Sequence, residues 1–204
     1  IAGMSVTTPD CTSARVAWTN SDTVKAELYR GDTLKATETI TSAQTHLFTS
    51  LVPNTTYKVK LSAACGEGYG EATERVFTTP SLPIVSGLTT APSYNGQTFT
   101  GSVTISWDAY TLTLGESDYY EMVITTLSNS TTDTITTTNI SSTKTPIALG
   151  SYTVKVRVKY GATYSGWTDE YPFVISNPNA PKNPTWTLTP NGNNYDVTVT
   201  WTKG

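Results

Sequence analysis

One stretch decides the fold class: Leu51-Val-Pro53-Asn-Thr55-Thr-Tyr57-Lys-Val59-Lys-Leu61-Ser-Ala63. Successive side chains of an extended strand point to opposite faces, so its tyrosine, valine, leucine and alanine share one face. A tyrosine that begins such a strand buries its ring, and its hydroxyl bonds back to the preceding corner. The pattern returns in Leu149-Gly-Ser-Tyr152-Thr-Val154-Lys-Val156-Arg-Val158. Each stretch predicts a central strand of a β-sandwich.

A second repeated strand ends in tryptophan. It occurs as Ala14-Arg-Val16-Ala-Trp18, as Val103-Thr-Ile105-Ser-Trp107 and as Val197-Thr-Val199-Thr-Trp201. The tryptophans are 89 and 94 residues apart, which is the size of a small β-sandwich. An Asn-Gly turn signal precedes the second and third copies, at Asn95-Gly96 and Asn191-Gly192. The repeat therefore predicts consecutive modules.

The composition and charge of the chain argue against some classes of function. The 204 residues carry 13 Lys+Arg against 16 Asp+Glu, and this balance argues against a nucleic-acid partner. No run of 18 apolar residues occurs, so we expect no membrane insertion. Short alternating runs of threonine, valine, tyrosine and tryptophan predict strands, and no stretch holds a helical period. The chain is predicted to be all-β.

These residues resemble the fibronectin type III family. Its hallmarks are the buried tryptophan of the second strand, the L-x-P-x-T-x-Y corner and the terminal Phe77-Thr-Thr79; the second repeat lacks the corner proline. The resemblance implies tandem immunoglobulin-like β-sandwiches in a linear array. We expect domains at 1–80 and 81–177, with 178–204 as the first two strands of a third, incomplete repeat. The expected structural core residues are Trp18, Tyr57, Trp107 and Tyr152.

The sequence offers few groups for catalysis, and we expect no enzyme activity and no cofactor. His46 is the only histidine, in Gln44-Thr-His46-Leu-Phe48, where it is expected on a surface strand. No G-x-S-x-G nucleophile elbow is present. The carboxylates Glu116, Asp118 and Glu121 cluster before a strand, with Asp169 and Glu170 farther on, and weak Ca²⁺ binding is the alternative to simple solvation. We predict no metal site.

The cysteines are expected to stay unbridged. In the sandwich that the resemblance implies, Cys11 lies in the first loop and Cys65 ends a strand at the opposite end. Their separation would exceed the reach of a disulfide. Cys65 is in phase with Val59 and Leu61, so it is predicted to face the core.

Two sets of short motifs have simple explanations. Arg30-Gly31-Asp32 spells the integrin-binding tripeptide, but a Gly-Asp pair between two strands closes a hairpin. Asn54, Asn129 and Asn139 begin glycosylation sequons. Such triplets also arise by chance in a chain rich in threonine and asparagine.

The loops carry the candidate ligand contacts. Tyr69, Tyr164 and Trp167 stand beside glycines, and exposed aromatic side chains on loops serve sugar or protein recognition. The alternative is that Trp167 packs under its own loop. Lysines and an arginine are predicted to form outward ladders: Lys58, Lys60, Lys155, Arg157 and Lys159.

The sequence predicts non-catalytic spacer modules of an extracellular fibre, virion appendage or cell-surface filament. The alternatives are an adhesion or carbohydrate-binding module and an accessory region of a secreted polysaccharide-degrading enzyme. Expected partners are other subunits or repeats of the same assembly, and surface glycans or a host-cell protein if the chain is adhesive. Two strands cannot bury a sandwich face, so we expect the polypeptide to continue; the alternative is completion by strands of another subunit.

Overall fold

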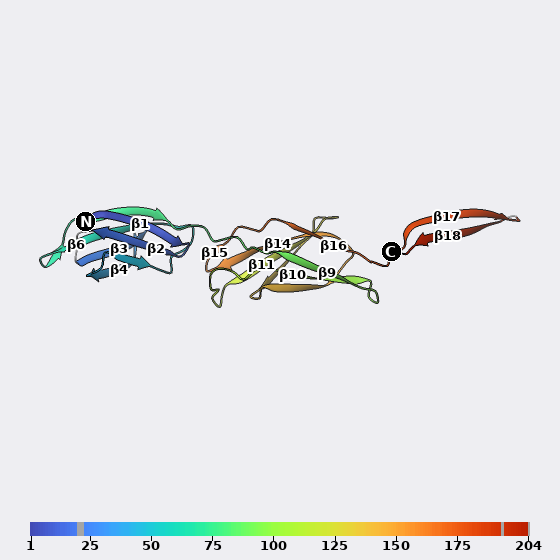
Figure 1. Ribbon diagram of the computed structural model, residues 1–204, viewed down its shortest axis with the longest axis horizontal. Coiled ribbons are helices and arrows are strands. Elements are labelled where there is room, and N and C mark those ends of the chain that lie inside the picture. Colours follow the sequence, from blue (N-terminus) through green and yellow to red (C-terminus); the bar gives the residue numbers. More distant parts are fainter. Residues whose placement is uncertain (20–22, 193, 204) are drawn as a thin grey trace. The chain divides into compact units, whose positions relative to one another are not determined.

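The computed structural model describes residues 1–19, 23–192 and 194–203 (Figure 1). Every regular element in these ranges is a β-strand. The strands form two β-sandwiches and a separate two-stranded sheet. This architecture confirms the predicted fold class of tandem fibronectin type III-like sandwiches. No helix that could cross a membrane occurs in the described part of the chain.

The first sandwich has one three-stranded and one five-stranded sheet, with orders β1-β2-β5 and β4-β3-β6-β7, and β8 pairs with β6. The alternation of β2, β3 and β6 directs their apolar side chains into a single core. Its strands are β1 (Ala2–Asp10), β2 (Ser13–Thr19), β3 (Thr23–Arg30), β4 (Thr33–Thr41), β5 (Thr45–Phe48), β6 (Thr56–Cys65), β7 (Gly68–Tyr69) and β8 (Thr73–Thr78).

The second sandwich repeats this plan. One sheet has the order β13-β10-β9, and the other has the order β12-β11-β14-β15 with β16 paired to β14. Its strands are β9 (Thr89–Asn95), β10 (Thr100–Ser106), β11 (Tyr119–Thr126), β12 (Thr132–Thr137), β13 (Ser141–Ile147), β14 (Gly150–Tyr160), β15 (Thr163–Tyr164) and β16 (Tyr171–Ile175).

Equivalent aromatic residues occupy equivalent places in the two cores. Trp18 and Trp107 are 2% and 4% exposed. Tyr57 is paired across the strands with Phe77, and the two rings stack with centroids 5.7 Å apart. The corresponding pair in the second sandwich is Tyr152 and Phe173, with centroids 5.2 Å apart. Each sandwich therefore closes around the same arrangement of rings.

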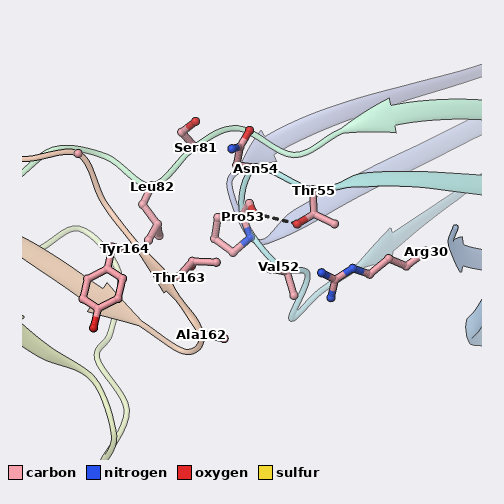
Figure 2. A pocket seen from close by; sticks show the side chains of 11 residues that line it. Arg30, Val52, Pro53, Asn54, Thr55, Ser81, Leu82, Ala162, Thr163 and Tyr164 are labelled. Carbon is pink, nitrogen blue, oxygen red and sulfur yellow. Dashed lines mark hydrogen bonds between the residues drawn. The ribbon is translucent and has the colours of Figure 1, made fainter.

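A corner precedes β6, and Figure 2 shows Val52, Pro53, Asn54 and Thr55 of this corner. The Thr55 hydroxyl donates to the Pro53 carbonyl oxygen at 2.9 Å. The backbone N–H of Val52 donates to the Tyr57 hydroxyl at 2.9 Å. In the second sandwich the Tyr152 hydroxyl instead donates to the carbonyl oxygen of Ala148, also at 2.9 Å. A tyrosine hydroxyl thus holds the corner in both repeats, although the second has no corner proline.

Thr79 adds a second tie to the first corner. Its side chain is buried, and its hydroxyl accepts a hydrogen bond from the Thr55 N–H and donates one to the Val52 carbonyl oxygen. The distances are 3.0 Å and 2.7 Å. The terminal threonine of the Phe77-Thr-Thr79 motif thereby satisfies two backbone groups of the corner.

The remaining strands are β17 (Lys182–Asn191) and β18 (Asn194–Thr202), which pair antiparallel. All of their residues are exposed. The third Trp-ending strand is therefore also part of a hairpin.

The prediction that Cys65 faces the core is wrong. The face of Tyr57, Val59 and Leu61 is buried, but the side chain of Cys65 is exposed. Cys65 is the last residue of β6 and pairs with Gly68 of the short strand β7. The alternation persists to the end of the strand, but burial ends earlier because β6 extends into a hairpin that the opposite sheet does not cover.

Candidate functional site

The aromatic residues predicted to contact a ligand have different surroundings. Tyr69, at the end of β7, is 44% exposed, and the Lys25 ammonium lies 5.1 Å from its ring centroid. Tyr164, at the end of β15, is 43% exposed. Trp167 lies outside the strands and is half-buried. Tyr69 and Tyr164 thus expose the larger aromatic surface.

Trp167 packs onto the outer face of β14. The Arg157 guanidinium lies 4.3 Å from its ring centroid, and the Lys155 ammonium lies 5.3 Å from it. The next residue fixes this position, because the Thr168 N–H donates to the Val156 carbonyl oxygen and the Val156 N–H donates to the Thr168 hydroxyl. Trp167 therefore packs against β14 of its own sandwich.

Charged groups extend this cluster along the same face. Arg157 donates from Nε and Nη2 to Glu121 Oε1, at 3.2 Å and 2.8 Å. The Lys159 ammonium lies 5.2 Å from the ring centroid of Tyr119. We name Tyr119, Glu121, Lys155, Arg157, Lys159 and Trp167 the outer cluster. Because its aromatic rings and its arginine already have partners, it stiffens the sheet face.

The first sandwich has a related arrangement. The ammonium groups of Lys58 and Lys60 lie 5.6 Å and 5.4 Å from the ring centroid of Tyr29. Lys60 also forms an ion pair with Glu74. This pairing raises the pKa of Lys60 and lowers the pKa of Glu74. The predicted lysine ladders are therefore paired with rings and carboxylates.

The carboxylates considered for Ca²⁺ do not converge. Asp118 is buried, and its Oδ2 accepts a hydrogen bond from the Gly115 N–H at 2.8 Å. Glu121 lies inside β11 and pairs with Arg157. Within the described ranges, no group of three or more His, Cys, Asp or Glu side chains is arranged to hold a metal ion.

His46 has an apolar neighbour. It lies in β5, half-buried, with its ring edge-on to Phe48 at a centroid distance of 4.6 Å. Its backbone pairs with Val16 of β2. This environment places the imidazole on a strand of the sandwich, where it supports packing.

The tripeptide Arg30-Gly31-Asp32 closes the hairpin between β3 and β4. Arg30 pairs directly with Thr33, which leaves Gly31 and Asp32 as the two turn residues. Gly31 has a φ of 59°, and a glycine at the first central position suits a two-residue hairpin turn. Turn geometry accounts for the motif.

The three sequon asparagines are exposed. Asn54 has a φ of 48°, and its N–H donates to the Pro80 carbonyl oxygen. Asn129 Oδ1 accepts hydrogen bonds from the N–H and the hydroxyl of Thr131. These residues serve their turns, and glycosylation stays a prediction.

The pairing of Trp167 with Arg157 was missed by sequence reasoning. The sequence contains one relevant signal. Lys155, Arg157 and Lys159 alternate on the outward face of their strand, and a tryptophan follows the turn that glycines bound. An outward row of cations offers a surface on which an aromatic ring can lie. The sequence alone does not show that the chain folds back onto that row.

The chain is similar to known proteins in sequence and in structure. Residues 1–79 match the family model described as the Fibronectin type III domain. A two-domain fibronectin type III segment of chicken tenascin is similar at 16% identity and a TM-score of 0.49, with 85% of this chain and 98% of that one covered. The FN1–FN3 domains of chicken CNTN1 are similar at 12% identity and a TM-score of 0.41, with 87% and 67% covered.

A redesigned β-sandwich protein is similar at 28% identity and a TM-score of 0.36, with 40% of this chain and 94% of that one covered. No curated protein matches the chain in the sequence search. Over residues 1–79, and so over the whole of its first sandwich, the chain is similar to the fibronectin type III domain family.

Proposed function

We propose that the chain is a non-catalytic structural segment, whose sandwiches act as spacer modules in an extracellular fibre, virion appendage or cell-surface filament. The observation that carries this proposal is the path of the chain through each sandwich. The first and last strands run in the same direction, so the polypeptide enters at one end of the sandwich and leaves at the other.

Strand pairing gives this path in the first sandwich. In one sheet, β1 and β5 are both antiparallel to β2. In the other sheet, β3 and β8 are both antiparallel to β6. The Thr73 hydroxyl at the start of β8 donates to the carbonyl oxygen of Ile1, next to the start of β1, so both strands begin at the same end of the sandwich and β8 runs in the direction of β1. A pull on the two ends therefore acts along the strands and shears many backbone hydrogen bonds at once.

The second sandwich follows the same path. β10 is antiparallel to β9, while β14 is antiparallel to β11 and β16 to β14. The covalent path thus gives each module the geometry of a load-bearing link. The outer cluster and the tyrosine corners stabilise that link without requiring a ligand.

Single-molecule force spectroscopy on the first sandwich tests this proposal. With handles at residues 1 and 80, the load runs along the strands. With handles at Asp32 and Asn54, which follow β3 and precede β6 at one end of the sandwich, the load separates strands one pair at a time. We expect a clearly higher unfolding force in the first geometry, and equal forces would contradict the spacer proposal.

An adhesive role is the second candidate, and the exposure of Tyr69 and Tyr164 favours it. Replacing both with alanine would then abolish binding to glycan-coated or cell surfaces while the unfolding midpoint stays unchanged. Trp167→Ala serves as the control, because its ring is engaged by Arg157. If the full chain binds no such surface, the adhesive role fails and the spacer role stands.

A further inference from the structure

The second sandwich has a groove of about 360 Å³ at the tip of its hairpin β9–β10 (Figure 1). Strands β9, β10 and β13 and the loop between β9 and β10 line this groove. Most of the lining side chains carry a hydroxyl or an amide, and these are Ser93, Asn95, Thr98, Thr100, Ser102 and Thr145. None of the described residues that line the groove is charged. The groove therefore offers neutral hydrogen-bonding groups.

Four hydroxyl groups of the groove are arranged in two pairs. Ser93 Oγ lies 2.7 Å from Ser102 Oγ, and Thr98 Oγ1 lies 2.9 Å from Thr100 Oγ1. A hydroxyl has one donor and two acceptor positions, so each pair uses one O–H internally and keeps the other for a ligand. Each pair also keeps acceptor positions. A ligand hydroxyl thus finds a donor and an acceptor at the same point.

Asn95 holds the loop and also presents donors. Its Oδ1 accepts hydrogen bonds from the N–H groups of Gln97 and Thr98, at 2.9 Å and 3.4 Å. Within the described part of the chain, its Nδ2 group forms no hydrogen bond. The side-chain amide therefore keeps two N–H donors beside the hydroxyl pairs.

Phe99 adds an exposed aromatic ring to this loop. It lies between Thr98 and Thr100, which both line the groove, and its side chain is 70% exposed. Residues 96–99 join the paired ends of β9 and β10, whereas only residues 11–12 join those of β1 and β2. The first sandwich thus folds without a longer loop and without an exposed ring at this place.

These groups select one class of ligand. The groove has no lining cation to pair with a phosphate or a sulfate, and no lining carboxylate to bind a metal ion. A neutral sugar has hydroxyls at the edge of its ring and C–H groups on its face. The hydroxyls match the paired side-chain hydroxyls, and the C–H face matches an aromatic ring.

We propose that the groove at the tip of β9–β10 binds a neutral glycan. The two hydroxyl pairs and the Asn95 amide bond the sugar hydroxyls, and Phe99 packs on the face of a sugar ring. This site differs from the aromatic loops considered above, because Tyr69 and Tyr164 lie on β7 and β15. It does not depend on the spacer role, since ligand binding and unfolding force are measured separately.

NMR titration of the isotope-labelled 204-residue chain tests this proposal. The probes are three neutral oligosaccharides, cellohexaose, mannohexaose and maltohexaose, and one acidic oligosaccharide, hexagalacturonate. At millimolar concentration, at least one neutral probe should shift the amide signals of Thr100 and Ser102. Hexagalacturonate should bind at least about tenfold more weakly, because its carboxylates would find no cation in the groove.

Phe99→Asn removes the ring in a way that suits the backbone. Phe99 has a φ of 53°, a left-handed conformation that asparagine adopts more readily than phenylalanine. We therefore expect the variant to fold with an unfolding midpoint no lower than that of the parent chain. It should weaken binding of the neutral probe by at least about tenfold.

Two serines of β10 serve as a matched pair. Ser102 lines the groove, whereas Ser106 lies on the same face of the same strand and outside the groove. Ser102→Ala should weaken binding about two- to tenfold, which corresponds to the loss of one hydrogen bond. Ser106→Ala should leave binding unchanged.

Four results would overturn the proposal. The first is that no neutral probe shifts the signals of the groove. The second is binding that Phe99→Asn leaves unchanged. The third is equal binding of hexagalacturonate, which would contradict the neutral class of ligand. The fourth is a set of shifts centred on Tyr69 or Tyr164, which would assign binding to those loops.

Discussion

At the scale of single residues, hydrogen bonds made by a few polar side chains hold the corners and turns of the first sandwich. Thr79 satisfies two backbone groups of the corner before β6, and Asp10 binds the turn between β1 and β2. Cys11 in that same turn is 4% exposed, whereas Cys65 at the far end of β6 is exposed. Each of these positions gives a measurable prediction.

Thr79→Val is expected to destabilise the first sandwich by about 1–3 kcal/mol, because it leaves the Thr55 N–H and the Val52 carbonyl without their partner. The measurement is the free energy of unfolding in denaturant. Thr78→Val is the control, since Thr78 is the neighbouring residue and is exposed at the end of β8, and it should change stability by less than about 0.5 kcal/mol. Equal effects of the two substitutions would contradict the role of Thr79.

Asp10 makes stability depend on acid pH. The Thr12 N–H and the Ser13 hydroxyl bind its carboxylate and lower its pKa below the ordinary value of 3.8. The stabilisation is therefore present above pH 3.8 and is lost as the pH falls through the lowered pKa. We expect Asp10→Asn to reduce the loss of stability between about pH 6 and about pH 2. An unchanged pH dependence would show that other carboxyls account for it.

The two thiols are expected to differ in reactivity. Burial raises the pKa of Cys11, which lowers its thiolate fraction, and Cys65 is open to solvent. One thiol should react quickly with a thiol reagent in the native chain, and both should react in denaturant. Cys65→Ser should remove the fast phase and Cys11→Ser should retain it. Two equal native rates would be inconsistent with this burial.

At the scale of elements, period-two alternation predicted the central strands correctly. Tyr57 and Tyr152 begin β6 and β14 with alternate residues buried, as the repeated stretch predicts. Prediction failed where burial depends on the opposite sheet. Cys65 is in phase with the buried side chains of β6, but it lies at the end of this strand, beyond the part that the opposite sheet covers. Trp167 posed a different problem, because the fold of a loop onto β14 depends on contacts distant in sequence.

The outer cluster gives a prediction at this scale. A double-mutant cycle of Trp167→Ala and Arg157→Ala should show a coupling energy of about 0.5–2 kcal/mol in the free energy of unfolding. The matched cycle of Trp167→Ala with Lys159→Ala should show coupling near zero, because Lys159 lies over Tyr119. Similar couplings in both cycles would mean that the cluster lacks this specific stacking.

At the scale of the whole molecule, the chain is a series of sandwiches that each lead the polypeptide from one end to the other. Cores of the same design, with a buried tryptophan and a stacked tyrosine–phenylalanine pair, close both modules. The third hairpin repeats the first two strands of that design and leaves its apolar face open. The repeated tryptophan and tyrosine strands predict consecutive modules of this kind.

The most direct measurement is the force–extension curve of the full chain pulled between its ends. A series of load-bearing modules predicts two separate unfolding events, one for each sandwich. The events should release roughly 240 Å and roughly 270 Å of chain. These lengths take about 3.5 Å per extended residue and subtract a folded length of about 30 Å. β17–β18 should add no event, because a two-stranded sheet is only marginally stable by itself. A single event, or extension without force peaks, would contradict the spacer function.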